Sequence, residues 1–245
     1  GAAINALSDN EGGMAKYFSQ RFAQVTNPPL DSIREQQGMT LRVALGNKPK
    51  FGGWHTKQIV IESPILNKTY FEKLCYQKEV KVNPFEMTFK PVLKDNEKTK
   101  QSLVSSINRL SEDVCAFAKR SGGIALLSDL AISKECAPIP MILAVSAVNQ
   151  ALIDNGLRMN VSLVLETGQV SSSHHVACAL GFGASAIYPL SVEIRSKEKF
   201  GSDPEGAFSR FAKATEKALL KTMGKVGLCT VESFIGGEFF EPNFL

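Results

Sequence analysis

Two apolar segments of the chain are each followed by polar side chains that could do chemistry. The segments are Ile124–Leu127 and Val161–Leu165, and the residues that follow them are Ser128, Asp129, Glu166, Thr167 and Gly168. Ligands of α/β proteins sit beyond the carboxyl ends of parallel strands, so these five residues form a candidate strand-end pocket. Each of them can equally cap the helix or the loop that follows it, and both interpretations stay open.

Two adjacent histidines, His174 and His175, open a predicted helix shortly after Glu166. Neighbouring residues on a helix point about 100° apart, so one ring can face the strand ends while the other faces solvent. One ring could act as a general base with Glu166 or Asp129, or both could simply pack or cap. The only other histidine is His55 and no H-x-x-x-H pair occurs, which argues against a zinc site.

Other short motifs carry little chemistry. Residues 181–186 match G-x-G-x-x-A, but they lie between a helix and the following strand, whereas a dinucleotide site needs the strand first. The 5 cysteines are widely spaced and form no C-x-x-C pair. This pattern is weak for a metal site or a disulfide framework and is typical of buried thiols in a reducing cytoplasm.

The elements that must position these residues follow an α/β pattern. Strands are predicted at Gln58–Glu62, Glu86–Val92, Ile124–Ser128, Val161–Glu166, Ala184–Tyr188 and Leu228–Val231. Helices are predicted over 100–119, from Pro140 to Asn155, from Ser173 to Leu180 and from Pro204 to Met223. Nearly continuous apolar strands are typical of a parallel sheet covered by helices on both faces. The pattern alone leaves a closed barrel and an open sheet as alternatives.

Two further helices are predicted near the N-terminus. The first covers residues 13–25 and ends at Asn27-Pro28-Pro29, since proline removes a donor. The second starts at Asp31 and carries Ile33, Leu41 and Leu45. We therefore expect one domain over residues 1–245, with a helical segment and loop over 1–57 and βα repeats over 58–245.

Composition excludes several classes. The 245 residues are 44% hydrophobic and carry a net charge of only +4, which is too mild to indicate a nucleic-acid partner. No apolar run of about 18 residues is present, so no membrane span is expected. Nothing resembles a secretory signal, and we expect a cytoplasmic protein.

Several segments, taken in order, resemble the central domain of the glutamate synthase large subunit. They are residues 17–35 (YFSQRFAQVTNPPLDSIRE), 61–66, 126–129, 137–148, 156–166, 174–175, 180–184, 218–233 and 239–241. The resemblance implies an α/β, βα-barrel-like fold of mostly parallel strands with two N-terminal helices. An incomplete or degenerate TIM-type barrel is one form that such a fold can take. It implies nitrogen assimilation as the biological context.

The resemblance also implies a division of labour. Glutamate synthases contain an amidotransferase domain that releases ammonia from glutamine and a domain with FMN and an iron–sulfur cluster that makes glutamate from 2-oxoglutarate. The central domain would connect the two and help enclose the ammonia route, with no catalytic residue, metal or cofactor of its own. The flanking domains would then be its partners. The segment with Tyr17, Phe18 and Phe22 and the tail 239–245 are candidate docking surfaces, and ordinary packing inside this domain is the alternative for both.

Some residues depart from the family. Asn149 and Gln150 stand where histidines are common, and Ser185, Tyr188 and Gly224 also differ. In the related FMN barrel, paired glycines let backbone amides approach the phosphate. Here a single Gly168 lies near the Glu166 carboxylate, and Pro189 has no N–H, so we expect no FMN. An autonomous flavin- or phosphate-ligand-binding barrel enzyme and a free-standing regulatory or assembly protein remain the alternatives.

Overall fold

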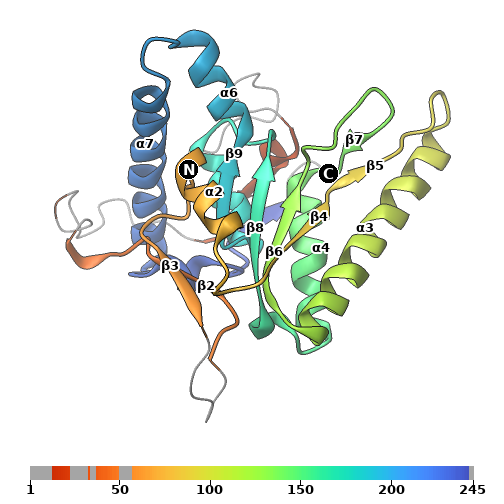
Figure 1. The fold of residues 1–245 in the computed structure, drawn as a ribbon, viewed down its shortest axis with the longest axis horizontal. Helices are drawn as coiled ribbons and strands as arrows, with labels where there is room; N and C mark the ends of the chain where they lie inside the picture. Colours follow the sequence, from red (N-terminus) through yellow and green to blue (C-terminus); the bar gives the residue numbers. More distant parts are fainter. Residues whose placement is uncertain (1–12, 23–32, 34–36, 50–56, 243–245) are drawn as a thin grey trace.

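The central element of the fold is a parallel sheet. The computed structural model describes residues 13–22, 33, 37–49 and 57–242. Four strands pair in the order β4-β6-β8-β9, all parallel to their neighbours (Figure 1). They are β4 (Val82–Glu86), β6 (Gly123–Ser128), β8 (Val161–Thr167) and β9 (Ala186–Pro189). The two middle strands are buried almost throughout, which explains their apolar sequences.

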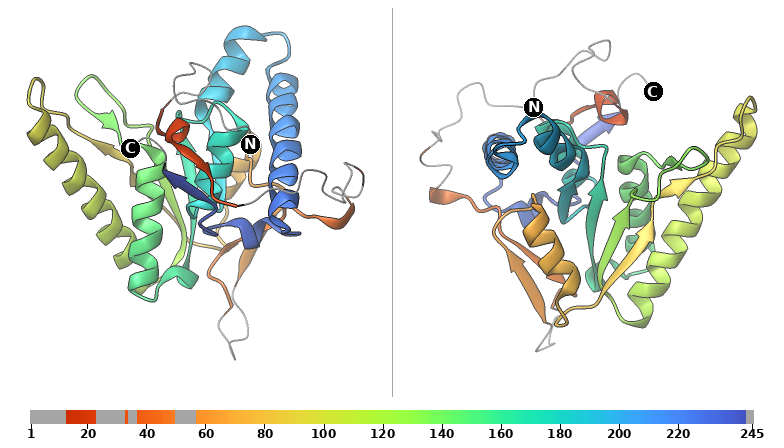
Figure 2. Two further views of the ribbon diagram at one scale, coloured as in Figure 1. Left: turned by 180° about the vertical axis from the view of Figure 1, so that it is seen from behind. Right: turned by 45° about the horizontal axis from the view of Figure 1, so that its top comes forward.

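Three helices connect successive strands and cover one face of the sheet. They are α3 (Asn96–Arg120), α4 (Met141–Asp154) and α5 (Ser173–Gly181). Phe85 of β4 meets Phe117 of α3 with ring centroids 5.8 Å apart, and Figure 2 shows α3 and α4 side by side along this face. Asp95 and Ser172 cap their helices by accepting backbone N–H groups, as their residue types predict.

Separate elements lie on the other face and at the amino ends of the strands. The antiparallel strands β2 (Val43–Gly46) and β3 (Gln58–Ile61) lie near the amino ends of the sheet, where Gly46 N–H donates to Ser162 Oγ over 3.0 Å. Helix α2 (Lys68–Tyr76) lies over β9 (Figure 1). Phe71 of this helix stacks on Tyr188, with ring centroids 4.4 Å apart.

The sheet is not closed into a barrel. Residues 64–66 run beside β9, where Ile187 N–H donates to Pro64 O and Leu66 N–H donates to Ile187 O. Among the described residues, the outer edge of β4 has no paired strand, and Pro84 lies in the middle of that edge. Proline lacks the N–H that a further ladder would need. The fold is therefore α/β with a parallel, open, barrel-like sheet.

The remaining elements flank this sheet. They are η1 (Met14–Tyr17), β1 (Phe18–Gln20), β5 (Thr88–Phe89), β7 (Ala137–Pro138), η2 (Arg158–Asn160), α6 (Leu190–Lys199), α7 (Pro204–Val226), α8 (Val231–Phe234) and β10 (Phe240–Pro242). Helix α7 begins at the Asp203 cap and ends at Gly227, whose φ of 86° is left-handed. Among all the residues that the structure describes, no helix combines the length and apolar character that crossing a bilayer requires.

The first predicted N-terminal helix is wrong over residues 13–22. Met14–Tyr17 form one 3-10 turn, and Phe18–Gln20 form β1, because these residues pair with β10 far along the chain. Residues 23–25, Asn27-Pro28-Pro29 and Asp31 lie outside the described residues. The second helix includes Ile33, but Leu41 and Leu45 do not continue it, since Leu45 belongs to β2.

Two predicted strands also need correction. The strand predicted at residues 86–92 has the wrong bounds. Strand β4 ends at Glu86, Thr88–Phe89 form β5 and residues 90–92 are in no strand, because the chain changes its pairing partner from β6 to β7 at Met87. The strand predicted at 228–231 is absent: Thr230 makes one isolated bridge to Thr40, and α8 begins at Val231. A single bridged residue makes no ladder, so this segment does not form a strand.

Aromatic residues of the two candidate docking segments pack against other parts of the domain, whereas Glu241 and Pro242 of the tail are exposed. Phe18 lies against Phe182 with ring centroids 5.1 Å apart, and Phe22 lies 6.2 Å from Phe239. Phe240 is only 5% exposed. The tail residues 243–245 lie outside the described part of the chain.

Candidate functional site

The predicted strand-end residues lie at the carboxyl edge of the sheet, where they form two separate groups. Ser128 and Glu166 are direct neighbours in the β6–β8 register, and the Ser128 hydroxyl donates to Glu166 Oε2 over 2.6 Å. Tyr188 is the next residue across, paired with Glu166 in the β8–β9 register. These three residues therefore form one row on the face that α2 covers.

The environment of this row is apolar on one side and acidic on the other. Burial, together with the nearby carboxylates of Glu193, Glu166 and Glu72, raises the pKa of Tyr188 to about 12. Burial, with the charges of Glu166 and Glu72, also raises the pKa of the Cys75 thiol. Both side chains are held in their neutral forms, so neither is an activated nucleophile or base at neutral pH.

Ionisation of Tyr188 is expected to destabilise the fold at alkaline pH. An unfolded tyrosine ionises near pH 10, whereas folded Tyr188 holds its proton to about 12. The free energy of unfolding is thus unaffected by this group below pH 10 and falls as pH rises from 10 to 12. Tyrosinate absorbance in a pH titration should show this late step, and it should vanish in Tyr188→Phe. A Tyr188 that ionises near pH 10, as an unfolded tyrosine does, would contradict the expectation.

The second group is centred on Asp129, on the opposite face of the same edge. Its carboxylate accepts the Thr167 hydroxyl over 2.6 Å, the Gly168 N–H over 3.0 Å and the Gln169 Nε2–H over 3.0 Å. Asp129 is 3% exposed and Thr167 is fully buried. The carboxylate and the loop after β8 are thus bonded to each other.

Gln169 is a member of this site that sequence reasoning missed. Its Nε2 donates to both Asp129 Oδ2 and Ile139 O, and its Oε1 accepts the Met141 N–H at the start of α4. A signal for it was available: α4 begins at Pro140-Met141, without a side chain that can cap it. An uncapped helix start indicates that its donors find a partner elsewhere.

The two histidines hold local structure. His174 Nε2 lies 3.0 Å from Ala15 O and 3.1 Å from Phe18 O, and since carbonyl oxygens only accept, this nitrogen carries hydrogen. His175, 2% exposed, accepts the Ser171 N–H at Nδ1 over 3.2 Å. His174 thus contacts the N-terminal segment, and also Phe240 and Cys178, whereas His175 bonds to the turn before α5.

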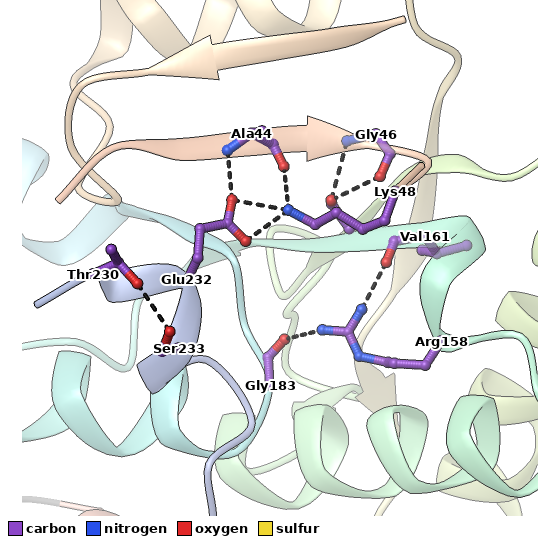
Figure 3. Close-up of polar contacts among 10 residues, drawn as sticks. Ala44, Gly46, Lys48, Arg158, Val161, Gly183, Thr230, Glu232 and Ser233 are labelled. Atoms are coloured by element: carbon purple, nitrogen blue, oxygen red, sulfur yellow. Dashed lines mark hydrogen bonds and ion pairs between the residues drawn. The ribbon is translucent and has the colours of Figure 1, made fainter. Parts of the chain in front are cut away.

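At the amino end of the sheet, Arg158 joins three segments, and Figure 3 shows its bonds to Val161 and Gly183. Its guanidinium donates to Asn149 Oδ1 over 2.6 Å, to Val161 O over 2.7 Å and to Gly183 O over 3.0 Å. Burial lowers the pKa of Arg158, and the charge of Glu232 opposes that shift. The acceptors come from α4, β8 and the turn before β9, so Arg158 stabilises their arrangement.

A second polar cluster ties β2 to α8 (Figure 3). Lys48 Nζ donates to Glu232 Oε2 over 2.7 Å and to Ala44 O over 2.8 Å, while Glu232 Oε1 accepts the Ala44 N–H. Thr230 and Ser233 share a hydrogen bond of 2.9 Å beside it. Every polar group in this cluster has a protein partner, which is typical of a structural joint.

Two surface hollows lie away from Ser128, Asp129, Glu166 and Thr167. One of about 790 Å³ lies between α2 with β3 and α6 with α7, and its rim carries acidic and basic side chains together. Another of about 260 Å³ lies beside α5 and includes His174, Lys221 and Lys225. Among the described residues, no group of three or more His, Cys, Asp or Glu side chains is placed to hold a metal ion.

Comparison with known proteins identifies the family. Residues 1–243 match the family model described as "Glutamate synthase central domain". The chain belongs to the glutamate synthase central domain family. It is 36% identical over 260 residues to the chloroplastic ferredoxin-dependent glutamate synthase of Spinacia oleracea, covering 97% of this chain and 16% of that protein. It is 33% identical over 250 residues to the NADPH glutamate synthase large chain of Bacillus subtilis, covering 98% and 16%.

Solved structures give a more distant likeness. A flavocytochrome b2 variant with sulfite bound matches 72% of this chain and 39% of its own, at 14% identity and a TM-score of 0.46. Another with pyruvate bound matches 54% and 32%, at 15% identity and a TM-score of 0.43. The family assignment rests on the central-domain match, and the chain spans about one-sixth of the glutamate synthases it resembles.

Proposed function

We propose that the chain is the connecting unit of a glutamate synthase. It would link a glutaminase domain to an FMN-containing synthase domain and help enclose the route that ammonia takes between them. The observation that carries this proposal is the match to a central domain over residues 1–243, in relatives about six times longer. A part that sits between two reaction centres contributes by holding them at a set separation.

The polar groups of the strand ends support a structural role for this domain. The Asp129 carboxylate is bonded to Thr167, Gly168 and Gln169, and the Glu166 carboxylate is bonded to Ser128. His174 and His175 bond to backbone groups of neighbouring segments. The candidate site therefore holds loops and helices in place, and we propose that the domain has no catalytic residue of its own.

The residues at this edge do not fit an FMN phosphate. The Gly168 N–H, the amide best placed to meet a phosphate, already donates to Asp129 Oδ1 over 3.0 Å. A phosphate there would face the Asp129 and Glu166 carboxylates, and like charges at short range repel. Pro189 at the end of β9 offers no N–H. The alternative of an autonomous flavin- or phosphate-binding enzyme is therefore disfavoured.

Added FMN is expected to leave the thermal melting temperature of the purified chain unchanged. A ligand that binds only the folded state raises that temperature by mass action. At a ligand concentration of a hundred times its Kd, the free energy of unfolding increases by about 2.7 kcal/mol. The measurement is a melt with and without FMN, together with a visible absorption spectrum. A yellow protein or an upward shift would contradict the proposal and revive the enzyme alternative.

The connecting role itself is tested by coupling. A polypeptide with this chain between its glutaminase and FMN domains should convert each ammonia released from glutamine into glutamate. The same two domains supplied as separate chains, without this one, should keep both half-reactions but release free ammonia. Equal coupling in both preparations would overturn the proposal and favour a free-standing regulatory or assembly protein.

The state of the thiols supports a proposal for the compartment. Cys75, Cys115, Cys136, Cys178 and Cys229 are all free of disulfide bonds. Free thiols are typical of a reducing compartment, and we propose the cytoplasm. The spinach relative is described as chloroplastic, so a plastid is the competing location.

A further inference from the structure

The two ends of the described chain form one structure. Strand β1 pairs antiparallel with β10, in the register Phe18 with Pro242, Ser19 with Glu241 and Gln20 with Phe240. The Arg21 N–H extends the ladder by donating to Phe239 O over 2.8 Å. We call Met14–Gln20 together with Phe240–Pro242 the terminal ribbon. Because the pairing is antiparallel, the chain comes into β1 at the same end of the ribbon where it leaves β10.

The terminal ribbon is fastened to helix α5. A two-stranded ribbon is marginally stable alone and needs a surface to pack on. His174 supplies hydrogen bonds from its Nε2 to Ala15 O and Phe18 O, at 3.0 and 3.1 Å. The Phe240 ring packs edge-on to the His174 ring, with centroids 5.8 Å apart.

The helix surface is shaped to receive the terminal ribbon. A Cβ atom at Gly181 would lie 2.8 Å from the Phe240 ring, so the absence of a side chain there leaves room for the ring. Phe18 packs on Phe182, the residue that follows α5, with ring centroids 5.1 Å apart. Phe234 stacks on Phe239 at 5.0 Å. Contacts from β1 and from β10 thus hold the terminal ribbon against α5 and the residue that follows it.

We propose that the terminal ribbon is the joint from which both neighbouring domains of the polypeptide extend. This inference rests on the proposed function and deepens it. With Phe18 paired to Pro242, the incoming and outgoing segments lie next to each other on the α5 side of the domain. The glutaminase and synthase domains are then held side by side at that joint, and this domain is a compact insertion between them instead of a spacer with a partner at each end.

His174 is the positioning residue of this joint. Its two hydrogen bonds reach the segment just before β1 and the first residue of β1, so they set where the incoming chain meets α5. Loss of these bonds frees the terminal ribbon locally. The sheet of β4, β6, β8 and β9 is held by contacts that do not involve His174. Short linkages hold two tethered sites at a high effective concentration, and a loosened joint lowers it.

A crosslink tests the geometry of the joint in the isolated chain. Residues opposite one another in a hydrogen-bonded antiparallel pair have Cα atoms about 5.5 Å apart, which is within the range of a disulfide. The double variant Ser19→Cys/Glu241→Cys should form an intramolecular disulfide in most molecules under mild oxidation, as mapped on non-reduced peptides. The matched control Ser19→Cys/Glu97→Cys should not, since Figure 2 shows the start of α3 far from β1 in both views. Failure of the first pair, or equal yield from both, would overturn the inference.

A coupling assay tests what the joint does. In a glutamate synthase polypeptide that carries this chain, His174→Leu should lower the glutamate formed per glutamine hydrolysed several-fold, with the glutaminase rate and the melting temperature nearly unchanged. His174→Gln keeps an N–H donor and should restore most of the coupling. Unchanged coupling in His174→Leu would overturn the positioning role.

The two proposals fail in different ways. Absence of the Ser19–Glu241 crosslink in the isolated chain removes this inference and leaves the connecting function standing. The opposite outcome is a crosslink that forms, together with a glutamate synthase polypeptide of unmodified sequence that fails to couple the two reactions. That outcome removes the connecting function instead. A crosslink that forms and abolishes coupling would show that the joint must open, which contradicts a fixed attachment point.

Discussion

Replacing Asp129 by alanine is expected to lower the free energy of unfolding by about 3 kcal/mol, measured by urea denaturation of the purified chain. The carboxylate is 3% exposed and accepts hydrogen bonds from Thr167, Gly168 and Gln169. Removing it leaves three donors without this acceptor in a place where little water can replace it. A buried donor without a partner costs about 1–3 kcal/mol, so the sum is large even after partial relaxation.

Two variants serve as controls for Asp129. Asp129→Asn keeps one acceptor oxygen and should cost clearly less than alanine. Ser128→Ala, one residue earlier, removes a single hydroxyl that donates to Glu166 at a half-exposed position, and it should cost about 1 kcal/mol or less. If Asp129→Ala and Ser128→Ala have the same stability, the Asp129 group does not hold the strand ends together.

Replacing Arg158 by methionine is expected to destabilise the domain by a similar amount, about 3 kcal/mol. Methionine fills much of the volume of the arginine stem but donates nothing. The acceptors Asn149 Oδ1, Val161 O and Gly183 O lie at the junction of α4, β8 and β9, where they would lose their donor. Replacing a buried charge is neutral only when its partners are replaced too.

The controls for Arg158 separate charge from geometry. Arg158→Lys keeps the positive charge but cannot reach three acceptors with a planar fork, so it should recover only part of the loss. Arg109→Met, on the exposed face of α3, should change the stability by less than about 0.5 kcal/mol. Urea denaturation of all three variants gives the comparison. Equal stability of Arg158→Met and Arg109→Met would refute the role assigned to Arg158.

Elements that depend on local signals were predicted well. The helix from 100 to 119 and the one from Pro204 to Met223 were placed within a few residues of α3 and α7, because apolar periodicity and capping residues are short-range properties. The buried strands at 124 and 161 were placed in the same way. Family membership was predicted from the order of motifs.

Elements that depend on distant partners were predicted poorly. Phe18–Gln20 have helical spacing but form a strand, since the hydrogen bonds of β10 are available only once the chain has folded back. Leu228–Val231 are apolar enough for a strand, yet their neighbourhood offers one bridge to Thr40 and no ladder. The hydrophobic periodicity of a short stretch of sequence does not reveal a strand partner that lies far along the chain.

The amino-acid pattern and the order of motifs were enough to predict an α/β unit of the glutamate synthase central domain family, and to show which polar residues follow its buried strands. What those residues do became visible only in the folded chain. Asp129 and Gly168 lie 39 positions apart, and their bond, like that of His174 to Ala15, exists because separate strands and helices come together. Hydrogen-bond partners are chosen by distance in space, so a list of polar residues becomes a site or a scaffold only when the fold brings the donors to the acceptors.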